Sequence, residues 1–120
     1  MNDLSFGDYL RTLIKQAGMT QTQFYTSLGI TKPYFYDILS GRVSPPPPEL
    51  QFKSIEILGT DGDARTLFFD LAAKDRGEVP ADIARWINTH PSMIKDIRNS
   101  INEQTILEEN YGKDKRGISD

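Results

Sequence analysis

The sequence predicts an all-α protein, with a five-helix domain followed by a two-helix C-terminal extension and a polar tail. Apolar residues recur at helical spacing along most of the chain, and glycines and prolines divide them into segments of helix length. No segment alternates apolar and polar residues as a half-buried strand would. The predicted boundaries are 1–76 for the first domain, 77–102 for a helical hairpin and 103–120 for the tail.

The clearest local pattern is a pair of short helices joined by a glycine turn. Thr20 can cap a helix that starts at Gln21, because Gln23 completes a Thr-x-x-Gln capping box. Gly29 supplies the left-handed position that ends this helix, and Thr31 caps the next one. The short turn between them predicts a sharp change of direction and an outward-facing second helix, which is the layout of a helix-turn-helix.

At these residues the chain resembles the lambda-repressor/Cro-like (xenobiotic-response-element type) family of helix-turn-helix regulators. The family pattern runs roughly Gly-Leu-Ser-Gln-x-x-Leu-Ala-x-x-Leu-Gly-Val-Ser-x-x-x-Ile-Ser-x-Ile-x-x-Gly-x-x-x-Pro. Residues 18–45 read Gly-Met-Thr-Gln-Thr-Gln-Phe-Tyr-Thr-Ser-Leu-Gly-Ile-Thr-Lys-Pro-Tyr-Phe-Tyr-Asp-Ile-Leu-Ser-Gly-Arg-Val-Ser-Pro. The resemblance extends from about Phe6 to Leu58, and Tyr25 stands where the family usually has alanine. It implies a five-helix domain that places its third helix in the major groove of DNA.

The other predicted helices of this domain are bounded by similar signals. Ser5 caps a first helix that Gly18 ends. The four prolines 45–48 predict a stiff, extended spacer after the third helix, and a docking site for a proline-binding groove is the less favoured interpretation. A fourth helix is predicted over 48–58. The fifth helix is expected to bury an apolar stripe of Ala64, Leu67, Phe68, Leu71 and Ala72.

Two further helices are predicted to begin at Pro80 and Pro91, and their apolar face is larger than a terminal hairpin needs for itself. This face either packs back onto the fifth helix or forms a subunit interface. A dimer suits a DNA reader, because a two-fold axis places a second reading helix one helical turn away. From Glu103 onward the chain is mostly polar and is expected to fray. The candidate dimer-interface residues are Ile83, Trp86, Ile87, Ile94, Ile97 and Ile101.

Candidate DNA contacts gather at the start of the second helix and on the outer face of the third. Helix N-termini present backbone amides that suit phosphate oxygens, and the resemblance implies that Gln21 touches the DNA backbone there. Lys32 can reach guanine O6 and N7 or a phosphate. Asp37 either accepts a hydrogen bond from cytosine N4 or pairs with Lys32 or Arg42. The complete candidate set is Gln21, Thr31, Lys32, Pro33, Tyr34, Tyr36, Asp37, Ser40, Arg42, Arg11 and Lys15.

Composition narrows the classes of function. The net charge is −3, but residues 1–48 carry a net +1, which is compatible with DNA binding without arguing for it. There is no cysteine, and the single His90 has no second histidine with which to share a metal. We therefore expect no metal, no cofactor and no enzymatic activity. The absence of an apolar signal segment or a membrane-spanning run leads us to expect a cytoplasmic protein without a membrane partner.

The leading hypothesis is a dimeric, sequence-specific regulator that binds an inverted repeat in double-stranded DNA. On the resemblance, it is a transcriptional repressor of a prokaryote, phage or mobile element. The alternative is a protein-binding module on the same scaffold, such as an antitoxin or an inhibitor of a CRISPR effector, with or without autoregulation. The exposed tyrosines expected on this surface favour that alternative, because tyrosine is a common anchor at protein interfaces. The sequence leaves both hypotheses open.

Overall fold

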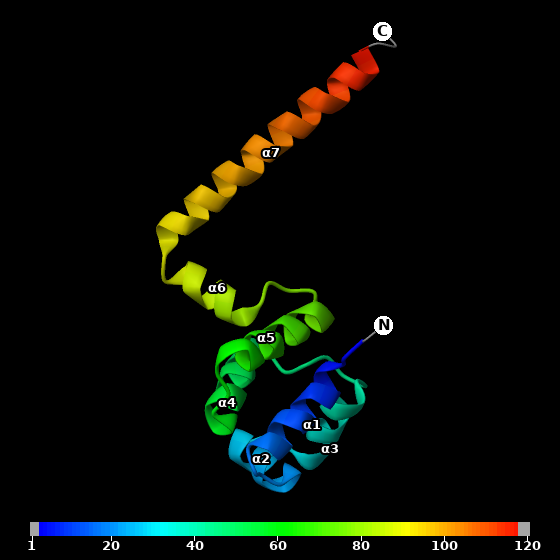
Figure 1. Ribbon diagram of the computed structural model, residues 1–120, viewed down its shortest axis with the longest axis vertical. Helices are drawn as coiled ribbons and strands as arrows, with labels where there is room; N and C mark the ends of the chain where they lie inside the picture. The colour runs from blue at the N-terminus through cyan, green and yellow to red at the C-terminus, as the bar shows by residue number, and fades with distance from the viewer. Residues whose placement is uncertain (1–2, 118–120) are drawn as a thin grey trace. The chain divides into compact units, whose positions relative to one another are not determined.

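The computed structural model describes residues 3–117, with side chains placed for residues 3–109. These residues form helices and no strand, so the predicted all-α class is confirmed. They divide into two compact units, with the boundary between Ile83 and Ala84. Figure 1 labels the helices in chain order: α1 (Phe6–Gln16), α2 (Gln21–Leu28), α3 (Lys32–Ser40), α4 (Pro48–Leu58), α5 (Gly62–Arg76), α6 (Ala81–Asn88) and α7 (Pro91–Gly117).

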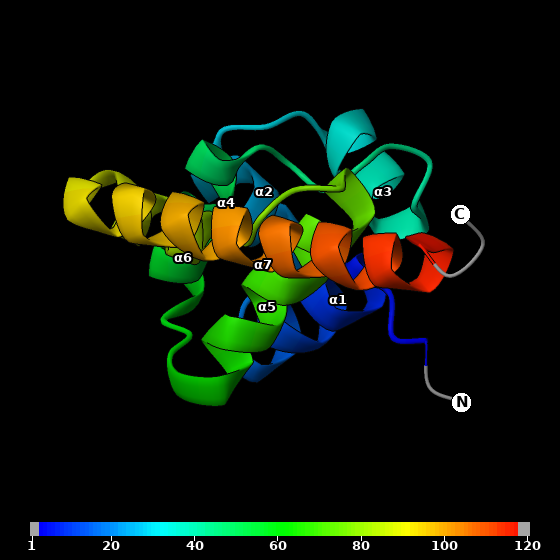
Figure 2. The same ribbon diagram turned by 90° about the horizontal axis from the view of Figure 1, so that it is seen from above.

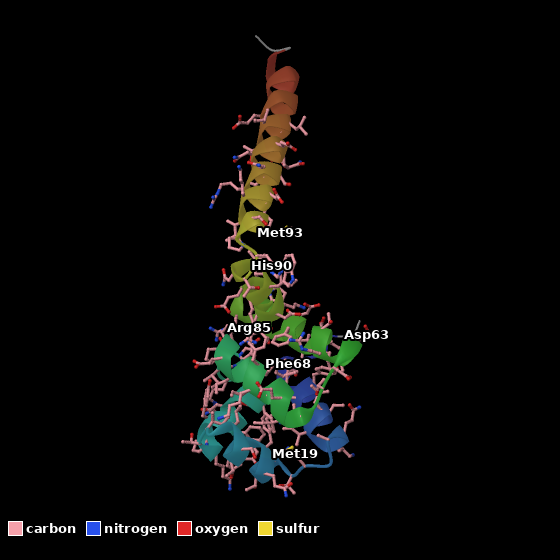
Figure 3. The ribbon with its side chains drawn as sticks, turned by 90° about the vertical axis from the view of Figure 1, so that its left-hand side faces the viewer. Met19, Asp63, Phe68, Arg85, His90 and Met93 are labelled. Carbon is pink, nitrogen blue, oxygen red and sulfur yellow. The ribbon has the colours of Figure 1, made fainter. Side chains whose placement is uncertain are left out.

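The first unit is built around α1, which packs against α2, α3 and α5, while α2 also packs against α3 and α4. Figure 2 shows α1 lying beside α5. Phenylalanines fill the space between these helices: the ring centroids of Phe6 and Phe68 are 5.1 Å apart, and those of Phe68 and Phe69 are 5.6 Å apart. Figure 3 labels Phe68, which is completely buried. Other buried core residues are Leu10, Leu13, Ile14, Phe24, Leu28, Phe35, Ile38, Leu39, Ile55, Leu58 and Ala72.

The approach of α1 to α3 depends on a glycine. Gly7 lies in the first turn of α1 and is buried. A Cβ at this position would come within 2.1 Å of the carbonyl oxygen of Leu39 in α3. That distance is far inside van der Waals contact, so any other residue would push the two backbones apart.

The buried face of α5 is rotated slightly from the predicted stripe, so one predicted residue is exposed and two others are buried. Leu67 is 38% exposed, while Phe69 and Ala73 are buried. The reason is a contact with α4, because the rings of Phe69 and Phe52 pack with their centroids 4.9 Å apart. Phe68 and Ala72 are buried and Ala64 and Leu71 pack against the core, as predicted. A stripe that includes Phe69 has a helical period as good as the predicted one, so periodicity alone misplaced Leu67 and missed Phe69.

The first unit extends past the predicted domain end at residue 76. Ala81, the first residue of α6, is buried in the same core. The Asp82 carboxylate lies 3.8 Å from the Arg65 guanidinium, which in turn lies over the ring of Phe69. These contacts attach the start of α6 to α5.

The last helix is longer than predicted, because α7 continues to Gly117 through the segment that we expected to fray. Residues 103–109 are Glu, Gln, Thr, Ile and Leu with no proline or glycine, and most of these residue types favour helix. Gln104 also donates a hydrogen bond of 3.2 Å to Glu108 one turn later. Residues 118–120 of the predicted tail lie outside the described range. Within that range, no helix has the length and apolar character needed to cross a membrane.

Candidate nucleic-acid interface

The turn between α2 and α3 has the cap geometry that the sequence predicts. The Thr20 hydroxyl accepts a hydrogen bond of 3.0 Å from the Gln23 amide, and the Thr20 amide donates one of 2.8 Å to the Gln23 side chain. Gly29 ends α2 with φ of 82°, a left-handed conformation that favours glycine. The Thr31 hydroxyl then accepts from the Tyr34 amide and starts α3. Both helices are therefore bounded by local hydrogen bonds, and Thr31 acts as a cap.

Aromatic packing holds α2 against α3. Phe35 of α3 is fully buried, and its ring centroid lies 5.9 Å from that of Phe24 and 5.3 Å from that of Tyr25. Tyr25 stands where the family pattern has alanine, and its half-buried ring rests on Phe35. The tyrosine is thus accommodated as an additional contact between the two helices.

Gln21 and Tyr36 join the start of α2 to the outer face of α3. The Tyr36 hydroxyl donates a hydrogen bond of 3.1 Å to the Gln21 Oε1 atom. The Tyr36 ring is exposed and contacts the edge of Phe35 at a centroid distance of 5.2 Å. Because its oxygen accepts this hydrogen bond, the Gln21 side chain keeps its NH₂ group, which carries two donors, for a partner outside the protein.

The remaining candidates on α3 divide into exposed and partly covered residues. Lys32 and Pro33 are exposed at the first turn of the helix. Tyr34 is half-buried against the core, so the expectation that it lies wholly on the outer surface is wrong. The Tyr34 position lies at the edge of the buried face of α3, so its side chain contacts both the core and solvent.

Asp37 forms the ion pair with Arg42 that the sequence left open. Arg42 Nε lies 3.7 Å from Asp37 Oδ1, and both side chains are partly or largely exposed. The Asp37 carbonyl oxygen also accepts from the Ser40 hydroxyl and the Arg42 amide, at 3.2 and 3.0 Å. The turn after α3 is therefore organised around Asp37. An exposed pair of this length contributes little to stability, so Arg42 can exchange its partner at small cost.

The two candidates on α1 differ in their partners. Arg11 donates to Asp8 at 2.7 Å, within the same exposed face of the helix. Lys15 is exposed in the last turn. Asp8 neutralises much of the Arg11 charge, so Lys15 supplies the stronger positive potential on α1.

The proline spacer is held at two successive carbonyl groups. Gln51 of α4 donates to the Pro46 carbonyl at 2.8 Å, and Arg76 of α5 donates to the Pro45 carbonyl at 2.9 Å. Pro45 and Pro46 are buried, as a structural spacer requires. Gln51 is also buried, and a leucine in its place would leave the Pro46 carbonyl without that donor.

Arg76 is itself positioned by Glu78. Its Nε and Nη2 atoms donate to the two Glu78 carboxylate oxygens at 2.8 and 3.3 Å. These bonds raise the pKa of the Arg76 guanidinium and lower the pKa of the Glu78 carboxyl. Arg76 thus connects the spacer after α3 to the end of α5, and Glu78 holds the Arg76 side chain in place.

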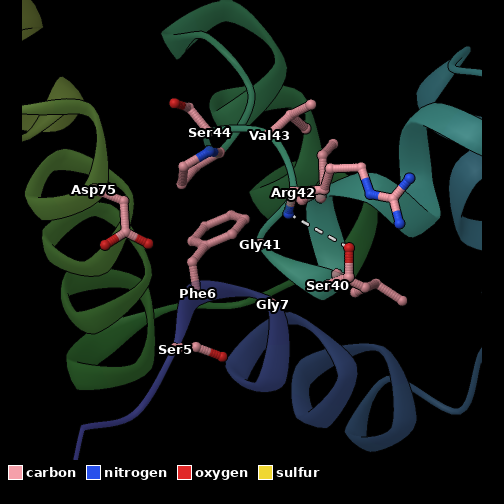
Figure 4. A pocket seen from close by; sticks show the side chains of 12 residues that line it. Ser5, Phe6, Gly7, Ser40, Gly41, Arg42, Val43, Ser44 and Asp75 are labelled. Carbon is pink, nitrogen blue, oxygen red and sulfur yellow. Dashed lines mark hydrogen bonds between the residues drawn. The ribbon is translucent and has the colours of Figure 1, made fainter.

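A cavity of about 410 Å³ opens beside this turn, between the start of α1, the residues after α3 and Asp75 of α5 (Figure 4). The Phe6 ring and the Ser44 side chain line it, and Figure 4 shows the Arg42 guanidinium directed away from Phe6 and Asp75. A carboxylate without an inward-facing cation is unsuited to a phosphate. The candidate phosphate contacts therefore lie on the outer side of the turn.

Sequence reasoning missed three residues that shape this surface: Gly7, Gln51 and Arg76. The signal for Gly7 was present, since a glycine inside a helical stripe often marks a close approach. Gln51 is one of several polar residues in the fourth helix, and its partner, the Pro46 carbonyl, is visible only in the fold. Among the described residues, no group of three or more histidine, cysteine or acidic side chains could hold a metal ion.

Comparison with known families gives one match. The profile of a family described as a helix-turn-helix domain matches residues 5–68, which is more than half of the chain. The match covers α1 to α4 and the first half of α5, and so includes all the candidate DNA contacts. Neither the curated proteins nor the solved structures gave a match.

Proposed function

The chain belongs to the helix-turn-helix family of the lambda-repressor-like kind, and from this premise we propose that it binds double-stranded DNA sequence-specifically. In this proposal α3 enters the major groove and two copies read an inverted repeat as a transcriptional repressor. One observation carries the proposal: Tyr36, on the exposed face of α3, donates a hydrogen bond to Gln21 at the start of α2, so these two candidate contacts lie side by side.

The proposed contacts follow from the chemistry of each group. Lys32 at the start of α3 reaches base edges or a phosphate, and Pro33 offers apolar contact with a thymine methyl. Gln21 donates to the DNA backbone at the N-terminus of α2, where the helix dipole also favours an anion. The flanking phosphate contacts are proposed to come from Arg11, Lys15, Tyr34 and Arg42. Tyr36 holds Gln21 in place, and Thr31, Asp37 and Ser40 hold the turns.

Selection from a pool of randomised duplex DNA at low salt tests the proposal. Enrichment of an inverted repeat, with half-sites about one helical turn apart, is the expected result for a two-fold reader. A folded protein that enriches no sequence would contradict sequence-specific binding. The enriched sequence, when present, leads to the regulated promoter.

We predict a steep salt dependence of duplex binding. Four cations per copy, Arg11, Lys15, Lys32 and Arg42, give a dimer about six to eight phosphate contacts, so affinity should fall roughly 10³-fold between about 50 and 200 mM salt. Electrophoretic mobility shifts over this range measure the slope, with circular dichroism at each salt as the control for folding. A flat response would mean that these cations do not face phosphates.

We predict that Tyr36→Phe weakens duplex binding by roughly three- to ten-fold, because one neutral hydrogen bond contributes about 0.5–1.5 kcal/mol. The substitution removes the donor to Gln21 and keeps the ring contact with Phe35. Fluorescence anisotropy with a selected duplex measures the change. Tyr25→Phe is the matched control, since it removes a hydroxyl from the neighbouring helix and should leave affinity unchanged. Equal affinities of Tyr36→Phe and the natural chain would contradict the role of the Tyr36–Gln21 bond.

We further propose that the chain dimerises, with the interface on α6 and α7. Five of the candidate residues are exposed in the chain by itself: Trp86 is 48% exposed, Ile101 is 58% exposed, and Ile83, Ile94 and Ile97 lie between 37% and 47%. Ile87 is half-buried. Exposed apolar residues of this size on successive turns are typical of an interaction surface. Light scattering at tens of micromolar distinguishes a dimer from a monomer, and a monomer would overturn this part of the proposal.

A protein-binding module remains the second candidate, and the electrostatics of the reading surface favour it. Two of the four cations proposed to face phosphates, Arg11 and Arg42, are paired with carboxylates of the same surface. Such pairing lowers the positive potential that draws a protein to DNA. A partner bound through this surface or through α6 and α7 would be found by co-purification when selection on DNA fails.

A further inference from the structure

We propose that α7 pairs in parallel with the α7 of a second copy, as a two-stranded coiled coil with Ile94, Ile97, Ile101 and Gln104 along its seam. The inference deepens the proposed dimer by naming the register and orientation of its contact. It extends the seam beyond the apolar residues that the sequence analysis selected, into the part of the chain expected to fray. The pairing itself does not require DNA.

The helix that would form this pair is exposed to solvent along most of its described length. Every residue from Ile94 to Glu109 is exposed, and Figure 3 shows side chains projecting on both sides of α7. A helix in a protein gains most of its stability from packing an apolar face, and α7 has no such packing between residues 94 and 109. A second helix along the apolar face would supply the missing packing.

The spacing of the seam residues is that of a coiled coil. The intervals from Ile94 to Ile97, Ile101 and Gln104 are three, four and three residues, which repeats the a and d positions of a heptad. Glu108 follows at the next a position, where two like charges would face each other. The seam therefore ends after Gln104.

The surface along this seam is hollowed where a partner side chain would enter. A shallow, wide-open depression of about 450 Å³ lies on one face of α7. Ser100 and Thr105 are small residues on its walls, which allow a second helix to approach closely. In coiled coils such depressions between four residues receive the side chains of the facing helix. The depression is lined by Ile97, Ser100, Ile101, Gln104, Thr105 and Glu108.

The charge pattern favours a second copy over a charged partner. In the heptad frame, Lys95, Asp96, Glu103 and Glu109 lie on the side away from the seam. Of the e and g positions beside the seam between residues 93 and 105, only Arg98 is charged. Coiled coils that choose an oppositely charged partner place their charges at those flanking positions. A seam without charges at those positions is compatible with pairing between two copies of α7.

Gln104 selects the parallel orientation. In a parallel pair it faces the Gln104 of the other copy, and an amide carries both donors and an acceptor, so the two satisfy each other. In an antiparallel pair a positions face d positions, so Gln104 would instead lie opposite Ile94, whose side chain offers no hydrogen-bond partner. A parallel pair also brings together the two ends of α7 that follow the helix-turn-helix segments in the chain.

Cysteine cross-linking of the full chain tests the proposal, because the natural chain has no cysteine. Gln104→Cys faces itself across a parallel seam, whereas Asn99→Cys lies on the opposite side of α7 and serves as the matched control. Under mild oxidation without DNA, Gln104→Cys should give roughly ten-fold more disulfide-linked dimer than Asn99→Cys, because a disulfide requires Cβ atoms about 3.5–4.5 Å apart. Circular dichroism confirms that both variants remain folded.

Other outcomes overturn the inference in distinct ways. Equal cross-linking of the two variants would mean random collision. Cross-linking that appears only between Ile94→Cys and Gln104→Cys chains mixed together would indicate an antiparallel pair. A monomer by light scattering, or a mass of three copies, would exclude a two-stranded coil. A monomer that still enriches a DNA sequence would refute this inference while leaving DNA binding intact.

Discussion

Gly7→Ala should lower the free energy of unfolding by about 3 kcal/mol or more, because it overpacks the contact between α1 and α3. The new Cβ would lie 2.1 Å from the Leu39 carbonyl oxygen, 2.7 Å from its carbon and 2.9 Å from its Cα. All three atoms belong to the backbone of α3, so no side-chain rotation relieves the clash. Urea denaturation of the full chain, followed by circular dichroism, measures the loss.

Gly7→Ala is expected to destabilise the protein, whereas the same substitution in a helix usually stabilises it. In an exposed helix interior, alanine in place of glycine stabilises by about 1 kcal/mol. Gly18→Ala is the control: nothing lies within 4 Å of its Cβ, and its φ of 71° predicts only the cost of about 1–2 kcal/mol for a left-handed alanine. A Gly7→Ala chain as stable as the natural one would show that α1 and α3 can separate without loss. The reading helix would then not depend on that close contact for its position.

Gln21→Ala combined with Lys32→Ala should reduce duplex affinity by roughly 10²–10³-fold, because each well-placed contact to DNA contributes about 1–3 kcal/mol. Neither side chain is part of the core, so the double variant should keep its fold. Fluorescence anisotropy with a selected duplex measures the affinity. The double variant also removes the acceptor of the Tyr36 hydroxyl, and the effect of that loss is already measured by Tyr36→Phe.

A matched pair of substitutions separates the loss of contact from the loss of charge. Lys95→Ala with Asn99→Ala removes one cation and one amide from α7 and should leave affinity nearly unchanged. Similar losses in both double variants would indicate a nonspecific charge effect. Unchanged affinity after Gln21→Ala with Lys32→Ala would mean that α3 is not the reading helix. Attention would then move to protein partners.

The sequence predicted well where the evidence is local. Thr20 and Gln23 form the capping box, Gly29 takes a left-handed conformation, and Thr31 caps α3, all at the expected positions. These features depend on hydrogen bonds and backbone preferences within a few residues, which the order of residue types determines. The same holds for the all-α class, since helical periodicity is a local property.

The sequence predicted burial and side-chain contacts less well where they depend on a residue from another helix or turn. It placed Leu67 in the buried face of α5, but the contact between Phe69 and Phe52 rotates that face. It left Asp37 with two interpretations until the turn after α3 brought Arg42 within 3.7 Å. It did not find Arg76, because the bond to the Pro45 carbonyl joins residues far apart in the chain.

The sequence by itself determined the all-α class, the caps of α2 and α3 and the helix-turn-helix, because each follows from hydrogen bonds and periodicity within a single segment. Only the tertiary structure decided which faces are buried, how closely α1 approaches α3 and which groups support the turn after the reading helix. Those outcomes depend on the packing of atoms from different helices. The physical reason is that a helical stripe specifies an apolar side but leaves its exact rotation and its neighbours to the fit between surfaces.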